Sequence, residues 1–357
     1  MPGECILKAR SATSNDVARR AGVSRAAVSV VLNGARSNIR VSAETRQRIL
    51  TAASELGYSP DLAAQSLRRG RSRVIGYVRR SFNGVLYEQP VPYHLGASIT
   101  RAAQNNGYHV IEVSAEGYTF HHRKELLQHL LGYRVDGVIF DWPGSVSDAQ
   151  QFVDEGLPIV QLIRPQLEVY TSSVTVDSSQ GINEAIHHLV SQGHQRIAFL
   201  GNGGSHPVDR MRLNNFRRAL EHRKVAVCDE YLRLGSVYSL EEGYRFTQDL
   251  LSLEIPPTAL FVASDIQALG VLRALYQAGV RVPEDLSVIS YDDTFAAYLY
   301  PPLTSVSQPL EEVAERAVAL IIEEIEATHT IQEKVQIVLP TRLTIRASTA
   351  PPGAKGS

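Results

Sequence analysis

Apolar residues near the start of the chain recur every three or four positions, which is the period of a helix that buries one face. In the stretch TSNDVARRAGVSRAAVSVVLNG, Thr13 and Asp16 resemble a capping box, so we expect a helix to begin there. Gly22 supplies a turn, and Ser24 can cap a second helix. The residues expected to face inward are Val17, Ala18, Ala21, Ala27, Val28, Val31 and Leu32. The pattern predicts two short helices joined by a tight turn.

A third helix is predicted to follow, with Ser42 as its cap and Gly57 as its stop. Its apolar face carries Ile49, Ala52, Ala53 and Leu56, with Tyr58 placed for the contact that accompanies such a stop. Three helices of this size close a compact bundle. Two helices joined by a tight glycine-containing turn are typical of proteins that insert the second helix into the major groove of DNA. The alternative is a helical pair that only packs.

The segment SPDLAAQSLRRG, residues 59–70, predicts a helix of only about two turns, a length that is marginal in water. Ser59 and Pro60 can start this helix, and Gly70 can end it. It is either an interdomain linker with a helical tendency or an element that folds only when DNA and a second subunit hold it.

From Arg73 onward, short apolar runs alternate with amphipathic helical stretches, which indicates parallel sheets with crossover helices. The first series of predicted strands is VIGYV, YHVIEVS, DGVIFD and PIVQLI, with helices near residues 93–106, 121–131 and 147–155. The second series, expected to begin near Val174, is SVTVD, RIAFLG, ALFVAS and SVISYDD. A helix at 310–327 and a last strand, VQIVLPTRLTI, complete the pattern. In open parallel sheets, ligands bind beyond the carboxyl ends of the strands.

Charge separates the two parts of the chain. Residues 1–73 hold 13 Lys+Arg and 5 Asp+Glu, a net of +8, whereas the remainder has a net of −9 within an overall −1. A basic head on an acidic body indicates that only the head meets a polyanion. The 357 residues are 44% hydrophobic and 20% charged, which is typical of a globular protein with two or three cores.

Several protein classes are disfavoured. No apolar run approaches the roughly 20 residues of a membrane helix, and the first residues lack the pattern of a secretory signal, so we expect a cytoplasmic chain without a membrane partner. Cys5 and Cys228 are expected to be reduced thiols. The loop GNGGSH has His206 where a dinucleotide fingerprint needs its third glycine. We therefore expect no catalytic residue, no metal site, no cofactor and no enzyme activity.

The runs NDVARRAGVSRAAVSVVLNG, VSAETRQRIL and ELGYSPDLAAQSLRRGRSRVIGYV resemble the amino-terminal signature of the lactose and galactose repressor (LacI/GalR) family of bacterial transcription regulators. The resemblance is dense over about sixty residues and looser to near Ser348. It implies an all-α helix-turn-helix bundle and hinge helix, followed by a two-lobed α/β domain of the periplasmic-binding-protein type. It also implies a homodimer that binds a near-palindromic double-stranded operator.

The resemblance assigns DNA-binding positions. Arg25, Ala26 and Val30 occupy positions that read base edges, and Ser24, Ser29 and Asn33 those associated with phosphate contact and helix support. Val30 departs from the usual polar residue, which favours an apolar readout. The hinge positions are Ala64, Gln65, Leu67 and Arg68, with Leu67 in the role of the leucine that wedges between central base pairs.

The resemblance likewise implies an effector site formed by Arg212, Tyr238, Ser264, Asp292 and Gln308. Arginine, aspartate and amide groups suit a hydroxyl-rich ligand, so we expect a sugar or related metabolite. Ser264 replaces the usual asparagine, and Asn215 stands where glycine is usual. These departures leave open a regulator that responds to a partner protein, or to nothing. A more distant alternative is a solute-binding transport protein.

The expected organisation follows from these patterns. Residues 1–12 form a tail, 13–58 the DNA-binding bundle, 59–71 the hinge, and 72–346 the effector-binding and dimerisation domain. Within that domain we expect a first lobe of about 72–173 and 308–332 and a second lobe of about 174–307 and 333–346. Residues 347–357, ASTAPPGAKGS, are predicted to be a disordered tail.

Overall fold

The computed structural model describes residues 12–33, 39–59, 71–79, 90–114, 123–141, 146–162, 171–203, 207–327 and 333–353. The chain divides between Arg73 and Val74 into two compact units, here called the head and the body. This division lies within two residues of the one expected from charge and pattern.

The head consists of α1 (Ser14–Ala21), α2 (Arg25–Asn33) and α3 (Ala43–Glu55). The predicted capping box is confirmed, because the Asp16 amide donates to the Thr13 hydroxyl and the Thr13 amide to the Asp16 carboxylate. Gly22 ends α1 with φ +64°, a conformation that favours glycine. The Ser24 hydroxyl accepts from the Ala27 amide at 3.2 Å, so the predicted cap of α2 is also present.

The predicted inward faces of the three helices form one core. Its buried members are Val17, Ala18, Ala21, Ala27, Val28, Ile49, Ala52 and Ala53, with Val31, Leu32 and Tyr58 packed against them. The expectation for Leu56 was wrong, since this side chain is 37% exposed. Leu56 is the C-cap that follows the last residue of α3, Glu55, and the chain turns at Gly57, so its side chain lies beyond the end of the buried face.

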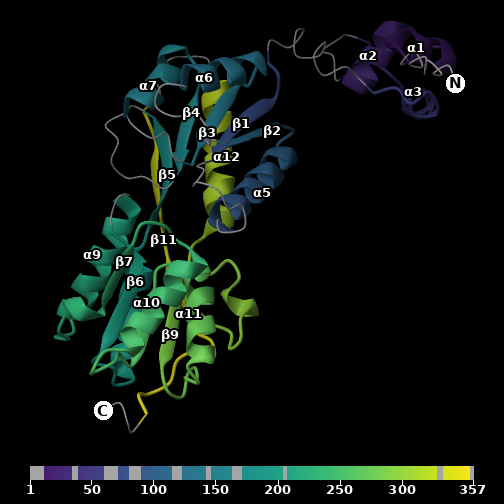
Figure 1. Cartoon of the computed structure of the whole chain (residues 1–357). Coiled ribbons are helices and arrows are strands. Elements are labelled where there is room, and N and C mark those ends of the chain that lie inside the picture. Colours follow the sequence, from purple (N-terminus) through teal and green to yellow (C-terminus); the bar gives the residue numbers. More distant parts are fainter. Residues whose placement is uncertain are drawn as a thin grey trace, which may run out of the picture. The chain divides into compact units, whose positions relative to one another are not determined.

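The first lobe of the body contains a six-stranded sheet in the order β11-β5-β4-β3-β1-β2. Its strands are β1 (Val74–Arg79), β2 (His109–Ser114), β3 (Gly137–Phe140), β4 (Ile159–Leu162), β5 (Ser172–Asp177) and β11 (Gln336–Pro340). Its helices are α5 (Pro90–Asn105), α6 (Arg123–Gly132), α7 (Val146–Asp154) and α12 (Leu310–Glu326). α5 and α12 lie side by side on one face (Figure 1), and α6 and α7 supply the core of the other.

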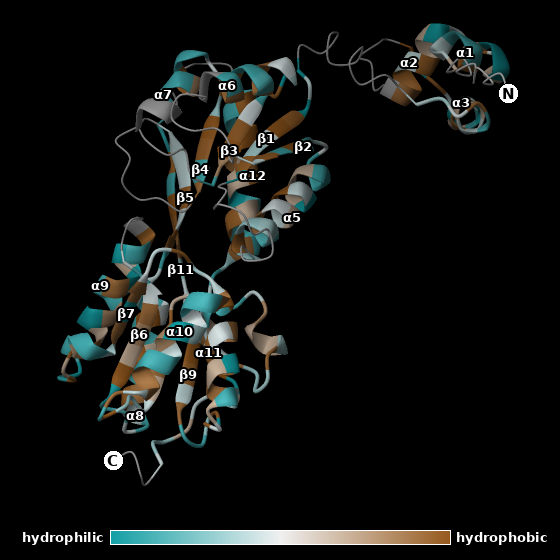
Figure 2. Cartoon of the chain, viewed as in Figure 1, coloured by the Kyte–Doolittle hydropathy of each residue, from teal (hydrophilic) through white to brown (hydrophobic). Residues whose placement is uncertain are grey.

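The second lobe contains the sheet β12-β10-β9-β8-β6-β7. Its strands are β6 (Ile197–Asn202), β7 (Leu232–Gly235), β8 (Ala259–Val262), β9 (Ser287–Asp292), β10 (Thr304–Ser307) and β12 (Arg342–Thr344). Helices α8 (Ser179–Ser191) and α9 (Pro207–Glu221) cover one face, and α10 (Leu240–Leu251) and α11 (Asp265–Gln277) the other. The helices cover the sheets because the strands are the more apolar elements: Figure 2 shows β1, β3 and β6 as largely hydrophobic, whereas α9 and α10 carry many hydrophilic residues.

The chain crosses between the lobes three times, and we call these segments the crossovers. The first is at Ser178, between β5 and α8; the second is Gln308–Pro309, between β10 and α12; and the third is Thr341, between β11 and β12. Each crossover leaves the carboxyl end of a strand. The carboxyl ends of both sheets therefore adjoin the crossovers, which is where a ligand of an open parallel sheet binds.

Two strand expectations were wrong. SVTVD does not open the second lobe, because β5 pairs in parallel with β4 and β11 in the first sheet. VQIVLPTRLTI is not one strand: β11 belongs to the first sheet, and β12 pairs antiparallel with β10 in the second. The break falls at Thr341, whose amide and hydroxyl both donate to the Asp177 carbonyl at 3.0 Å. The first lobe thus includes residues 172–177 and 336–340.

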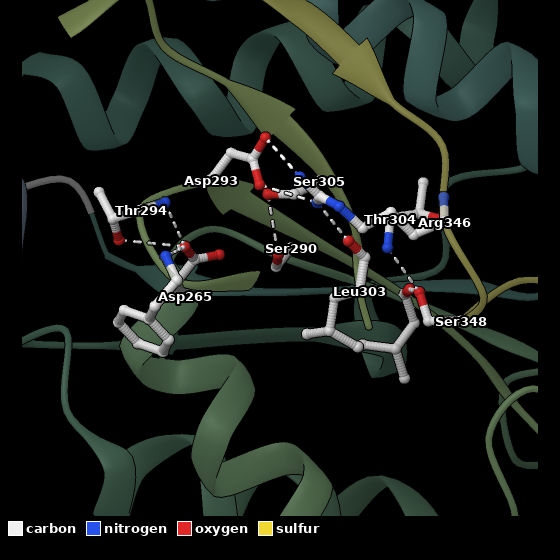
Figure 3. Close-up of polar contacts among 11 residues, drawn as sticks. Asp265, Ser290, Asp293, Thr294, Leu303, Thr304, Ser305, Arg346 and Ser348 are labelled. Atoms are coloured by element: carbon white, nitrogen blue, oxygen red, sulfur yellow. Dashed lines mark hydrogen bonds and ion pairs between the residues drawn. The ribbon is translucent and has the colours of Figure 1, made fainter. Parts of the chain in front are cut away.

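The expectation of a disordered tail from residue 347 was wrong for the residues that the structure describes. Residues 345–353, here called the C-terminal strap, lie against the second lobe. Ser348 is fully buried; its hydroxyl accepts from the Thr304 amide at 2.8 Å and donates to the Val288 carbonyl. Arg346 donates to the Leu303 carbonyl and pairs with Asp293 (Figure 3). Hydrogen bonds and an ion pair hold this segment, and the hydropathy pattern of the sequence does not predict such interactions.

Candidate functional site

In the head, α2 presents the side chains that the sequence assigns to DNA. Arg25 and Ala26 are exposed, and Ser29 and Val30 are half-buried. Ser24 is exposed and also caps α2. Asn33 is the last residue of α2, but its side chain lies outside the described residues, as do the hinge positions Ala64, Gln65, Leu67 and Arg68.

The orientation of α2 is set by the turn before it. Arg48 of α3 donates through Nη2 to the carbonyls of Ala21 and Gly22, which are left without helical partners at the end of α1. Arg20 pairs with Glu55 at 2.6 Å. These contacts fix α3 against the turn, so α2 is held by its apolar face while its other face carries Arg25 and Ala26.

In the second lobe, Arg212 of α9 lies at the centre of a buried polar cluster. Its Nη1 donates to the Ala263 carbonyl at 2.7 Å, and its Nη2 to Asp292 Oδ1 at 3.3 Å. The guanidinium carbon lies 3.9 Å from the ring centroid of Tyr291 and 5.6 Å from that of Tyr238, so cation–π attraction adds to the ion pair. Among the described residues, Arg212 Nε has no hydrogen-bond partner.

Asp292 ends β9 and receives a second donor from the residue that follows β10. Gln308, in the second crossover, donates through Nε2 to Asp292 Oδ1 at 2.7 Å. Asp292 and Gln308 are 5% and 9% exposed. Hydrogen bonds therefore join Arg212, Asp292 and Gln308, three of the five predicted effector residues.

Tyr238 joins this cluster through a residue that the sequence analysis missed. Its hydroxyl donates to Asp209 Oδ1 at 2.6 Å, and Asp209 is 4% exposed on the first turn of α9. Asp209 and Arg212 are three residues apart and thus share one helix face. That spacing within a predicted helix was the available signal.

Ser264 has a structural task as well. It is 2% exposed, and its hydroxyl caps α11 by accepting from the Gln267 amide at 3.3 Å. Ser264 follows Ala263, whose carbonyl accepts from Arg212, so it lies beside the cluster, with no hydrogen bond to Arg212, Asp292 or Gln308 among the described residues.

Burial dominates the electrostatics of the cluster. It raises the pKa of Asp292 to about 7, and the nearby Arg212 only partly offsets this effect. Burial opposes the charge on Arg212, but the tyrosines and carboxylates around it raise its pKa overall. Burial likewise raises the pKa values of Tyr238 and Tyr291, the latter to about 12. Arg212 thus stays charged, while Asp292 exchanges a proton near neutral pH.

The first lobe has a related arrangement at the end of β1, which the sequence analysis also missed. Arg79, 8% exposed, pairs with Glu112 of β2 at 2.7 Å and lies 4.7 Å from the ring centroid of Tyr93. A charged residue that ends an apolar strand was the signal. Each lobe therefore places an arginine, a carboxylate and a tyrosine near the carboxyl ends of its strands.

The described ranges contain no group of three or more His, Cys, Asp or Glu side chains that could hold a metal ion. They also contain no helix that is both long and apolar enough to cross a membrane.

Comparisons with known proteins agree with both units. Residues 13–61 match the bacterial regulatory proteins of the lacI family, and residues 186–349 match a periplasmic binding protein-like domain. Catabolite control protein A of Priestia megaterium is 30% identical, over 94% of this chain and 99% of that protein. The HTH-type transcriptional repressor PurR of Mannheimia succiniciproducens is 33% identical, over 94% and 98%.

Solved structures show the same likeness. The Lac repressor dimer bound to operator and the anti-inducer ONPF matches with a TM-score of 0.78 and 30% identity, over 96% of this chain and 100% of that one. A complex of the transcriptional regulator CelR with cellobiose matches with a TM-score of 0.68 and 31% identity, over 94% and 99%. This chain, with its helix-turn-helix head and two-sheet body, belongs to the lacI family of bacterial regulatory proteins.

Proposed function

We propose that this DNA-binding regulator is a repressor whose operator affinity changes when a sugar or related metabolite binds between the lobes. The observation that carries the proposal is the buried cluster of Arg212, Asp292 and Gln308 beside the crossovers. Charged and amide groups in a fixed geometry engage vicinal hydroxyls. Tyr238 supplies an aromatic face, and Ser264 a hydroxyl at the edge of the site.

On the DNA side, the exposed face of α2 carries the proposed readout. Arg25 suits a bidentate contact with guanine, and Val30 an apolar contact with a thymine methyl. Ser24, Ser29 and Asn33 are proposed to hold the phosphate backbone. In the hinge, Ala64, Gln65 and Arg68 are proposed to contact the minor groove and Leu67 to wedge between base pairs.

The proposed assembly is a homodimer in the cytoplasm, without enzyme activity. Two heads related by a twofold axis read two half-sites, so the operator is near-palindromic. The effector acts only through its different affinity for two arrangements of the lobes, and by linkage the operator must change effector affinity by the same factor. Two similar regulators of known structure, CelR with cellobiose and a LacI family regulator from Enterococcus faecium with bound ribose, support a sugar as effector.

Calorimetric titration with a panel of neutral sugars that includes cellobiose and ribose, run beside a gel-shift assay, tests the proposal. The DNA probe is a fragment that the protein retains from genomic DNA. We expect one ligand to change operator affinity by roughly fivefold or more, as is typical of allosteric coupling. Asp292→Ala should abolish this response and keep operator binding, whereas Leu67→Ala should weaken binding and reduce DNA bending. A ligand that binds and leaves operator affinity unchanged would contradict the proposal.

A second candidate is a regulator of the same family whose operator affinity is controlled by a partner protein. Two observations favour it: Arg212 already bonds Ala263 and Asp292 within the chain, and Ser264 is engaged as a cap. In that case no sugar in the panel should bind, while operator binding stays intact.

A further inference from the structure

Asn215, where the family resemblance would place a glycine, has a contact that the proposed function does not use. It lies on α9, three residues after Arg212, and its Nδ2 donates to Ser178 Oγ at 2.9 Å. Ser178 is 1% exposed and is the whole of the first crossover. The amide therefore joins the helix that carries Arg212 to a point where the chain passes between the lobes.

The hydroxyl of Ser178 bonds Asn215 and does not make the hydrogen bond that is usual at its position in the chain. Ser178 occupies the N-cap position of α8, where a serine hydroxyl normally accepts from an amide of the first turn. It makes no such bond; instead, the Ser179 amide donates to Asp177 Oδ1 at 2.8 Å. Among the contacts described for Ser178, the amide of Asn215 is the partner of this buried hydroxyl.

The other two crossovers also make hydrogen bonds to nearby residues. Gln308 of the second crossover donates to Asp292, the carboxylate that pairs with Arg212. Thr341 of the third donates to the Asp177 carbonyl and accepts from the Gly181 amide at 3.1 Å. A Cβ at position 181 would lie 2.6 Å from Thr341 Oγ1, so glycine permits this close approach. Hydrogen bonds thus connect the Arg212 cluster with the second crossover, and Asn215, on the same helix as Arg212, with the first. The third crossover bonds Asp177 and Gly181, which lie on either side of the first.

We propose that Asn215 is a positioning residue that couples the effector cluster to the first crossover and favours the lobe arrangement that binds operator. The proposal rests on the proposed function. Any shift of Arg212 moves α9, and α9 carries Asn215 with it, so Ser178 must follow or lose its partner. Without the bond, fewer molecules hold the operator-competent arrangement, and apparent operator affinity falls in proportion.

The test compares Asn215→Ala with Asn214→Ala in the full chain. The two residues are neighbours of the same type on α9, but Asn214 is exposed, so alanine there removes no crossover contact. We expect Asn215→Ala to weaken operator binding about threefold or more, the scale of mutations along a coupled network, and Asn214→Ala to leave it unchanged. The head is a separate compact unit, so α9 substitutions spare its DNA-reading residues.

Ser178→Ala supplies a second variant and a double-mutant cycle. If the Asn215–Ser178 bond carries the effect, Ser178→Ala weakens binding similarly, and the double variant is no weaker than either single one. Circular dichroism and thermal unfolding check that each variant is folded, and affinities are compared per folded molecule. Should Asn215→Ala not fold, Ser178→Ala alone decides.

Operator binding by Asn215→Ala or Ser178→Ala that is equal to or tighter than that of wild type would overturn the inference, and so would strict additivity in the double variant. None of these results would touch the proposed function, which depends on the response of the wild-type chain to ligand. Conversely, a wild-type chain that binds operator and answers no ligand contradicts the sugar proposal, while the cycle still decides whether Asn215 sets operator affinity.

Discussion

Asp292 occupies a position that is energetically unfavourable in two respects. Its carboxylate is almost fully buried, and its backbone has φ +103°, followed by φ +56° at Asp293. Non-glycine residues rarely adopt such conformations, and those that do cluster at ligand-binding and switch regions. Arg212 and Gln308 hold the first carboxylate, and Arg346 holds the second. Strain retained at the end of β9 is consistent with a binding role for Asp292.

The raised pKa of Asp292 predicts a specific dependence of stability on pH. Between its unfolded value of 3.8 and its folded value of about 7, the folded chain binds a proton that the unfolded chain has released. The stabilisation is therefore complete below pH 3.8 and is lost as the pH rises to 7, by on the order of 1 kcal/mol per pH unit. In urea unfolding at pH 5, 6 and 7, the stability of wild type relative to Asp292→Asn should fall at each step.

A matched change on the surface controls for general effects of charge. Asp249, on the exposed face of α10, offers Asp249→Asn, whose stability difference from wild type should stay nearly constant over the same range. Parallel stability curves for wild type and Asp292→Asn would show that Asp292 is ionised throughout, contrary to the expectation.

At the scale of helices and strands, the sequence predicts correctly the features that depend only on neighbouring residues. Thr13, Ser24 and Ser42 cap the helices that they were predicted to cap, because a cap is formed within four residues. Strand partners are set by residues far apart in the chain, so β5 and β11 were placed in the wrong lobe, and β7 and β10 were not predicted.

The same reasoning applies to the candidate site. The family resemblance identified Arg212, Asp292 and Gln308, which the structure brings together. Asp209 and the Arg79–Glu112 pair were not predicted, because a charged side chain is expected to be exposed to solvent unless a structure shows that it is buried. The C-terminal strap was missed for a similar reason, since its anchors are hydrogen bonds.

The strap should contribute measurably to the stability of the second lobe. Ser348→Ala removes an acceptor for the Thr304 amide and a donor to the Val288 carbonyl, both on fully buried residues. We expect a loss of about 2 kcal/mol in the free energy of unfolding. Thr349→Ala, at a half-buried hydroxyl that bonds His188, should cost less than about half as much. Equal losses in thermal or urea unfolding would mean that the buried hydroxyl has no special role.

At the scale of the whole molecule, charge separates the two tasks of the chain. The head carries a net of +8 and the body −9, so the field of the protein favours approach of DNA to the head. The body, by contrast, is suited to a ligand whose binding does not depend on a strong positive electrostatic potential. Binding of the two ligands should consequently respond differently to salt.

Operator binding should weaken steeply as salt rises, because basic side chains displace counterions from the phosphates. A dimer with about six or more phosphate contacts loses roughly a thousandfold in affinity between 50 and 200 mM salt. Binding of a neutral sugar in the body displaces no such ions, so its affinity should change less than about twofold. Gel-shift and calorimetric titrations at matched salt concentrations measure both slopes. Operator affinity that barely responds to salt would place recognition outside the basic head, whereas a steep salt slope for the effector would indicate an anionic ligand, since a neutral one has no counterions to release.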